Sequence, residues 1–157
     1  MAKTHQVPLY YLAILRIMVG YHFFRVGWPK LTGRFLGSEQ VIGQFSNIAA
    51  DPIGFHRAFI TDFVIPNAVA FSYLVALGEV AIALSFMSGC LVRVSAAFAA
   101  FYNLNIYLAV GYPNGGAQMH LNRIYIILNL IFVLTAAGRA LGVDGWLKKK
   151  YPNSWLF

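Results

Sequence analysis

The chain has 157 residues, of which 59% are hydrophobic and 11% are charged, and its mean hydropathy is +0.64. Soluble domains carry about 25% charged residues, so this composition excludes an ordinary soluble protein and indicates a polytopic membrane protein. The net charge of +7 is better explained by cytoplasmic loops and anionic lipid headgroups than by nucleic acid. The single cysteine, Cys90, excludes an internal disulfide, a CxxC redox pair and a cysteine-rich metal site.

Four apolar segments are long enough to cross about 30 Å of hydrocarbon, which takes about 20 helical residues each. They are predicted at about 8–28, 66–87, 91–110 and 121–141. The first segment begins after a basic residue, as a signal peptide does, but Arg16 interrupts its apolar run and no clear cleavage site follows, so we interpret it as an uncleaved span. The predicted fold is therefore all-α: a four-helix transmembrane bundle that forms one domain over residues 1–157.

The long segment between the first two spans carries a helical pattern of its own. Ser38 is suited to cap a helix and Glu39 to stand in its first turn. Apolar residues from Val41 to Ala49 then follow one helical face, until Asp51 and Pro52 end the pattern. We predict an amphipathic helical insertion with surface helices at about 38–50 and 55–63, which lie on the membrane surface or cap the bundle.

The distribution of lysine and arginine predicts the orientation in the membrane. With four spans, both termini and the second connection share one side, which carries Lys3, Arg93, Arg139, Lys148, Lys149 and Lys150. The other side carries Lys30, Arg34, Arg57 and Arg123. Because cytoplasmic loops are enriched in basic residues, we expect a multi-pass protein of the inner (plasma) membrane with both termini in the cytoplasm.

Polar side chains are predicted inside all four spans. Arg16 and Glu79 each lie about eight residues from a cytoplasmic helix end, which is about 12 Å deep at about 1.5 Å per residue. An ion pair between them would remove most of the cost of burying either charge. Asn103 and Asn129 fall nearer the midplane. Two interpretations stay open: polar contacts that hold the helices together, or a proton or quinone site.

A second polar cluster is predicted at the opposite boundary, where span one ends and span four begins. His22 and Arg25 are three residues apart and share a helix face, as do His120 and Arg123. Together with Lys30 they would form a pocket for an anion or a quinone carbonyl, in which histidine can pass a proton. The alternative is side chains that snorkel toward water at helix ends. The sequence contains no metal-binding motif.

Three segments together resemble the DoxX-like family of small four-helix membrane proteins. "LRIMVGYHFFRVGWPKL", "LGEVAIALSFMSGCLVRVSA" and "AAGRALGVDGWL" are similar to that family's LR…G…HGxxKL, GE…G…L…G…R and GxGR…SLD patterns, in the same order over nearly the whole chain. The matching positions are Arg16, Gly27, Lys30, Glu79, Arg93, Arg139 and Asp144. Val26 departs from the pattern, since the commoner form has histidine there; His22 lies one turn earlier. "GVD" replaces "SLD".

The portion around spans two and three looks most like DoxD, the small membrane subunit of thiosulfate:quinone oxidoreductase. This resemblance implies an integral membrane subunit of a quinone-linked, thiosulfate-oxidising electron-transfer complex. It would have no covalent cofactor, a bound quinone, and a second subunit or another copy as partner. We expect Glu79, Arg16 and His22 to be the catalytic group, and Arg25, Lys30, His120 and Arg123 to bind substrate.

The same resemblance also fits a protein of another class, a non-catalytic accessory or assembly subunit of a larger membrane complex. The small size and the lack of a redox motif suit both functions. Whether the chain is an enzyme therefore stays open at this point. A transporter is a weaker alternative, because four spans without a detectable internal repeat suit alternating access poorly.

Overall fold

The computed structural model describes residues 10–157, the side chains of residues 38 and 39 excepted. Lys3 and the start of the first predicted span lie outside the described residues. The prediction of an all-α fold is confirmed, since residues 10–157 contain helices and no strand. The α-helices are α1 (Tyr10–Thr32), α2 (Ser38–Gln44), α3 (Gly54–Phe59), α4 (Ala68–Ser88), α5 (Val92–Ile106), α6 (Tyr112–Asn114), α7 (Gly116–Thr135) and α8 (Val143–Lys150).

Three helices of the described chain are long and apolar enough to cross a membrane. They are α4, the continuous helix Val92–Asn114 that begins with α5, and α7. Helix α1 has a similar length, 23 residues, but Arg16, His22 and Arg25 make it less apolar. The chain is therefore a membrane protein, as predicted, and a membrane crossing by α1 stays a prediction.

Helix α1 extends beyond its predicted end at residue 28. Pro29 lacks a backbone N–H, which costs the helix one hydrogen bond. The helix nevertheless continues to Thr32, and the N–H of Gly33 donates to the carbonyl of Pro29 at 2.8 Å. This extra turn matters for the site, because it places Lys30 three residues after Gly27 and thus on nearly the same helix face.

Helix α7 is displaced relative to its prediction at 121–141. It begins at Gly116 and ends at Thr135, where Ala136 takes a left-handed backbone conformation with φ of 51°. The chain then passes Gly138 close to another segment, since a Cβ added at Gly138 would lie 2.1 Å from Oδ2 of Asp144. The apolar run to residue 141 thus includes a tight turn that hydropathy alone does not reveal.

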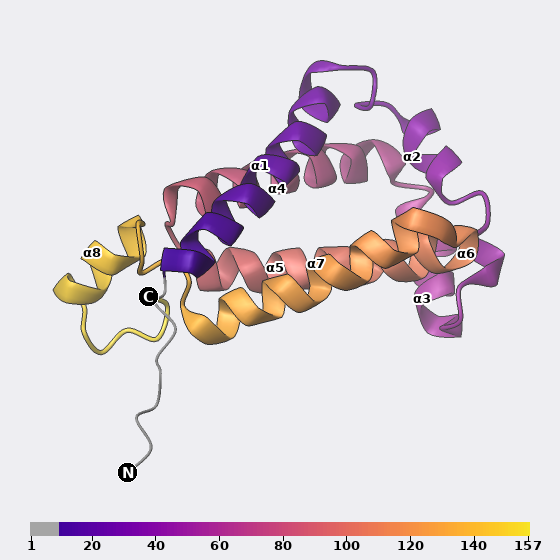
Figure 1. The fold of residues 1–157 in the computed structure, drawn as a ribbon. Helices are drawn as coiled ribbons and strands as arrows, with labels where there is room; N and C mark the ends of the chain where they lie inside the picture. The colour runs from indigo at the N-terminus through magenta and orange to yellow at the C-terminus, as the bar shows by residue number, and fades with distance from the viewer. Residues whose placement is uncertain (1–9) are drawn as a thin grey trace, which may run out of the picture.

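The long helices form two pairs, α1 with α4 and α5 with α7, which lie one over the other in Figure 1. The pairs share an apolar core in which Phe86 makes edge-to-face contacts with Phe23 at 6.2 Å and with Phe132 at 5.5 Å. Helix α8 lies at one end of the pairs, and α2, α3 and α6 lie at the other (Figure 1).

The segment between α1 and α4, residues 33–67, is called the insert here. Its first predicted helix, 38–50, is α2 followed by a short 3₁₀ turn at Ile48–Ala50, and its second, 55–63, is α3 followed by a π-helical segment at Ile60–Val64. The insert packs on the end of the bundle through a second apolar core. That core contains Phe35, Val41, Phe45, Ile60, Val64, Ala68, Ala76 and Ala109.

Candidate functional site

A cavity of about 530 Å³ lies between the two helix pairs, at the end that the insert covers. Its size is in the range of small-molecule pockets, which is roughly 300–1,000 Å³. Helices α1, α4, α5 and α7 each contribute polar side chains, and α2 and α6 add one each: His22, Lys30, Gln44, Glu79, Tyr102, Asn103, Asn114, Gln118, Asn122 and Tyr125. Apolar side chains, among them Phe23, Ile106 and Leu121, complete the lining. We call this space the Glu79 cavity.

Glu79 is the central polar residue of this cavity, and its side chain is only 3% exposed. The ammonium of Lys30 donates to Oε1 of Glu79 at 2.6 Å. The hydroxyl of Tyr102 donates to the same oxygen at 2.5 Å. The other oxygen, Oε2, is buried and has no partner among the described residues. A buried carboxylate oxygen without a donor is costly, so the group Lys30–Glu79–Tyr102 is not a fully satisfied polar contact between helices.

Gly27 allows α1 and α4 to approach each other closely beside the Lys30–Glu79 contact. A Cβ added at Gly27 would lie 2.8 Å from Cβ of Glu79 and 3.1 Å from the backbone nitrogen of Val80. A glycine is therefore required where α1 crosses α4. The close crossing, together with the extra turn of α1, brings Lys30 to Glu79.

Two aromatic side chains connect α1 with α7 beside this network. The imidazole of His22 stacks on the ring of Tyr125, with centroids 4.7 Å apart and planes inclined by 24°. Both residues line the Glu79 cavity. The ring of His22 thus borders the cavity, and its role in catalysis stays a prediction.

The predicted ion pair between Arg16 and Glu79 is wrong. The partner of Glu79 is Lys30, whereas Nη2 of Arg16 donates to the carbonyl of Leu141 at 3.1 Å. The helices are antiparallel, and a Cβ at Gly20 would meet Phe86 and Met87. Arg16 therefore lies near Gly89, well beyond the level of Glu79. The depth estimate failed because it assumed that both helices start and end at the same level.

Arg16 belongs to a densely packed group at the opposite end of the bundle, which we call the Arg16 cluster: Arg16, Gly89, Gly138, Gly142 and Asp144. The Arg16 side chain is fully buried. A Cβ added at Gly89 would lie 2.0 Å from its Nη1 and 2.5 Å from Cα of Gly142. The glycines thus make room for the guanidinium and leave none for a ligand.

Asp144 gives the Arg16 cluster a second structural function. Its Oδ1 accepts from the N–H of Leu91 at 2.7 Å, and its Oδ2 accepts from the N–H of Val92 at 2.9 Å. These N–H groups open helix α5, where the first turn has no intrahelical acceptors. A carboxylate at this position also interacts favourably with the helix dipole. The buried Asp144 therefore caps α5 from a distant part of the chain.

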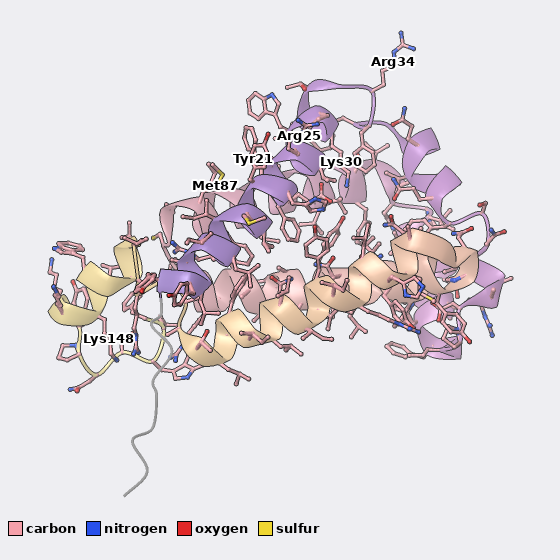
Figure 2. All side chains as sticks on the ribbon, in the orientation of Figure 1. Tyr21, Arg25, Lys30, Arg34, Met87 and Lys148 are labelled. Carbon is pink, nitrogen blue, oxygen red and sulfur yellow. The ribbon has the colours of Figure 1, made fainter. Side chains whose placement is uncertain are left out.

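The other cationic residues of the predicted outer pocket do not line the Glu79 cavity. Arg25, His120 and Arg123 are exposed, and Arg123 donates to the hydroxyl of Tyr107 at 2.8 Å. Figure 2 shows Lys30 directed toward the space between the helix pairs, whereas Arg34 extends away from the bundle. Of the predicted substrate-binding residues, the structure brings only Lys30 into the cavity.

The two asparagines predicted near the midplane make no hydrogen bond to a neighbouring helix. Nδ2 of Asn103 donates to the carbonyl of Ala99 in its own helix at 2.7 Å. Asn129 is fully buried, and neither of its side-chain polar atoms has a partner among the described residues. Asn103 lines the cavity and Asn129 does not.

Comparison with known proteins identifies the family. A family model described as DoxX matches residues 11–111. The chain belongs to the DoxX family. Neither the curated proteins nor the solved structures gave a match.

The positions that carry the DoxX resemblance fall into separate regions of the structure. Gly27, Lys30 and Glu79 form the helix crossing at the cavity. Arg16 and Asp144 belong to the Arg16 cluster. The other two bind the C-terminal segment, since Arg93 donates to the carbonyl of Trp155 and Arg139 to that of Phe157, each at 2.6 Å.

Tyr102 is a cavity residue of this DoxX protein that was not among the predicted catalytic or substrate-binding residues. Its hydroxyl donates to Oε1 of Glu79. A phenol directly followed by Asn103 in an alanine-rich span is a signal that could have found it. On α7, Asn122 and Tyr125 line the cavity, whereas His120 and Arg123 do not.

A second buried polar network, also missed, fastens the insert to α5. Nδ1 of His56 lies 2.5 Å from Oδ2 of Asp51, and Nε2 of His56 lies 3.0 Å from Oδ1 of Asn105. Oδ1 of Asp51 accepts from the N–H of Ile53 at 2.8 Å. The close spacing of an aspartate and a histidine in the insert was the available signal. Within residues 10–157, no three His, Cys, Asp or Glu side chains gather as a metal site would require.

Proposed function

We propose that this protein is an integral membrane subunit of a quinone-linked electron-transfer complex, and that the Glu79 cavity receives the quinone headgroup. The observation that supports this proposal is the hydrogen-bonded group Lys30–Glu79–Tyr102 at the wall of a cavity between apolar helices. Ionisable groups inside a membrane protein are rare and usually serve a function. Here two such groups, Lys30 and Tyr102, donate to one oxygen of a third, Glu79, beside a ligand-sized space. Helix packing alone does not require this arrangement.

The residues of the cavity suit the chemistry of such a ligand. A quinone supplies two-electron chemistry that amino acid side chains do not. Tyr102, Glu79 and Lys30 form a hydrogen-bonded group at the cavity wall through which a proton can pass. His22 and Tyr125 offer an aromatic surface against which a flat ring can pack. Gln44 of the insert lines the cavity at one end.

The proposed membrane arrangement follows from helix packing and charge. We place α1 as the fourth span, because it crosses α4 in close contact, with Gly20 against Phe86 and Gly27 against Glu79. The end that carries α8 also carries basic residues, and it is the end that we assign to the cytoplasm of the plasma membrane. These basic residues are Arg93, Arg139, Lys148, Lys149 and Lys150. The Glu79 cavity then lies in the outer half of the membrane.

Thiosulfate oxidation, which the resemblance to DoxD implies, belongs on a partner subunit in this proposal. The cavity's one ammonium group already pairs with Glu79, and the exposed Arg25 and Arg123 lie outside the cavity. A dianion would therefore lack the cationic partners that it needs. The partner would oxidise the anion and pass electrons to a quinone held by this chain.

A photoaffinity experiment tests the proposal. The protein, in lipid nanodiscs, is illuminated with an azido-benzoquinone, and the labelled peptides are identified by mass spectrometry. We expect labels on the segments that contain Tyr102 and Tyr125, and we expect an excess of unlabelled benzoquinone to suppress them. Ile106→Trp, which fills the cavity, should abolish labelling.

The matched control is Phe98→Trp, a substitution on the exposed face of the same helix, which should leave labelling unchanged. Both variants are first compared with the parent by thermal unfolding, so that a folding defect is recognised. Labelling that is absent in the parent, or equal in both variants, would contradict the proposal. It would favour the alternative function, a non-catalytic accessory or assembly subunit.

A further inference from the structure

The Glu79 cavity is open on one side, between α1 and α7. The residues that line it from α4 and α5, among them Glu79 and Asn103, are buried or half-buried. Five other lining residues, which come from α1, α2, α6 and α7, are exposed and mark its mouth: Val26, Gln44, Asn114, Gln118 and Leu121. The cavity therefore has a closed back, formed by α4 and α5, and an open front.

Aromatic contacts close the front of the bundle at one edge of this mouth. The ring of Tyr125 on α7 stacks on His22 of α1 at 4.7 Å and contacts Phe23 at 6.2 Å. Because α1 and α7 run in opposite directions, one helical turn toward the insert leads from His22 to Val26 and from Tyr125 to Leu121. These two side chains are 36% and 45% exposed. The front therefore opens directly beyond the stacked rings, between one apolar residue of each helix.

The mouth has two chemically different sides. Gln44, Asn114 and Gln118 form a polar rim at the end that the insert covers, and Val26 and Leu121 form an apolar rim nearer the middle of the bundle. Leu121 lies five residues after the start of α7, which is about 7.5 Å along the helix axis. Helix α7 is long and apolar enough to cross a membrane. In the proposed membrane arrangement, the apolar rim therefore faces hydrocarbon and the polar rim lies at the level of the headgroups.

From this arrangement we infer that the mouth is a lateral portal to the membrane, and that the ligand is a quinone with a long hydrocarbon chain. The ring occupies the Glu79 cavity, and the chain passes over Val26 and Leu121 into the lipid. This inference rests on the proposed function and adds to it the class of quinone and the path by which it enters. A chain that crossed the polar rim would instead cover amide groups and meet water, which is unfavourable for both.

A probe with its photoreactive group on the chain tests the portal. It is a decyl-benzoquinone whose chain carries a diazirine next to the ring, and it is illuminated with the protein in nanodiscs. We expect labels on Val26 and Leu121, located by mass spectrometry and suppressed by an excess of unlabelled decyl-benzoquinone. Suppression is the criterion, because a probe dissolved in the membrane also reacts with lipid-facing residues by collision, and an unlabelled competitor does not reduce that reaction.

The variant Leu121→Asn sharpens the test, because it makes the apolar rim polar. The affinity for decyl-benzoquinone, referred to its concentration in the membrane, should fall roughly fivefold, since the chain would cover the amide. The affinity for methyl-benzoquinone, which has the ring but no chain, should not change. Leu130→Asn makes the same substitution at an exposed leucine of α7 that does not line the cavity, and it should leave both affinities unchanged.

The outcomes separate this inference from the proposed function. If the ring azide labels the segment of Tyr125 but the chain diazirine labels the polar rim, or gives no suppressible label, the inference is overturned while the quinone site stands. For Leu121→Asn, an unchanged affinity for the decyl probe, or an equal loss for both probes, would likewise overturn it. If neither the ring azide nor the chain diazirine gives a suppressible label, both the site and its portal are rejected. Labelling of the parent decides the matter even if Leu121→Asn fails to fold.

Discussion

The two ends of the helix bundle each bury a charged side chain, but they surround it in opposite ways. At one end, Arg16 is enclosed by glycines so closely that a Cβ added at Gly89 would lie 2.0 Å from the guanidinium. At the other end, Glu79 borders a cavity of about 530 Å³. Both side chains have polar atoms without partners among the described residues. A buried charge in a membrane protein therefore indicates a ligand site only where the structure also provides space.

The largest effect is expected at the densely packed end. Gly89→Ala would place a side chain in a left-handed conformation, since φ is 70°, and would press it against Arg16 and the backbone of Gly142. Left-handed strain costs roughly 1–2 kcal/mol and overpacking roughly 1–3 kcal/mol, so we expect a loss of about 2–5 kcal/mol in the free energy of unfolding. Denaturation of the purified protein in detergent measures this loss.

Gly78→Ala is the matched control for this prediction. Gly78 lies within α4, and an added Cβ would meet nothing within 4 Å. Replacing a helical glycine by alanine should stabilise the protein by roughly 0.5–1 kcal/mol. Similar losses for the two substitutions would mean that the Arg16 cluster is not as densely packed as described.

A smaller effect is expected at the cavity. Glu79→Ala leaves Lys30 without its partner, and breaking a buried pair costs roughly 3–5 kcal/mol. Lys30 is 19% exposed and can turn toward water, so we expect about 2–3 kcal/mol, with Glu79→Gln costing less. Thermal unfolding of both variants, compared with Asp62→Ala at an exposed position, checks the order. Equal stability of all of them would show that the Lys30–Glu79 contact contributes nothing.

The smallest effect is expected in the insert and should be local. His56→Ala removes the contacts with Asp51 and Asn105, each of which contributes roughly 0.5–1.5 kcal/mol. We expect faster amide hydrogen exchange in α3 and the following π-helical segment, and unchanged exchange in α4. His120→Ala, at an exposed histidine, is the control. Unaltered exchange in α3 would mean that the network does not fasten the insert.

Sequence patterns placed the elements of the fold well but not their register. Hydropathy located the apolar helices, and turn-forming residues located the insert. The end of α1 was missed because a proline usually ends a helix, although here it costs only one hydrogen bond near the terminus. The helix continued by one turn, and that turn carries the lysine that pairs with Glu79.

The site was predicted in part for a similar reason. His22, Lys30 and Glu79 were chosen as ionisable residues in or beside apolar spans, and all of them line the cavity. His120 and Arg123 were chosen because they share a helix face. Periodicity shows which residues of α7 share a face, but it does not show which face turns inward. Asn122 and Tyr125, on the neighbouring face, line the cavity instead.

The sequence by itself determined that this is a membrane protein, that it is all-helical and that it belongs to the DoxX family, because composition and motif order are properties of the chain alone. The tertiary structure decided that Glu79 pairs with Lys30 while Arg16 lies in the glycine cluster. The reason is that helix register depends on where glycines let two backbones approach. Close approach of Gly27 to Glu79 and of Gly20 to Phe86 fixes α1 against α4, and only that contact decides which buried charges meet.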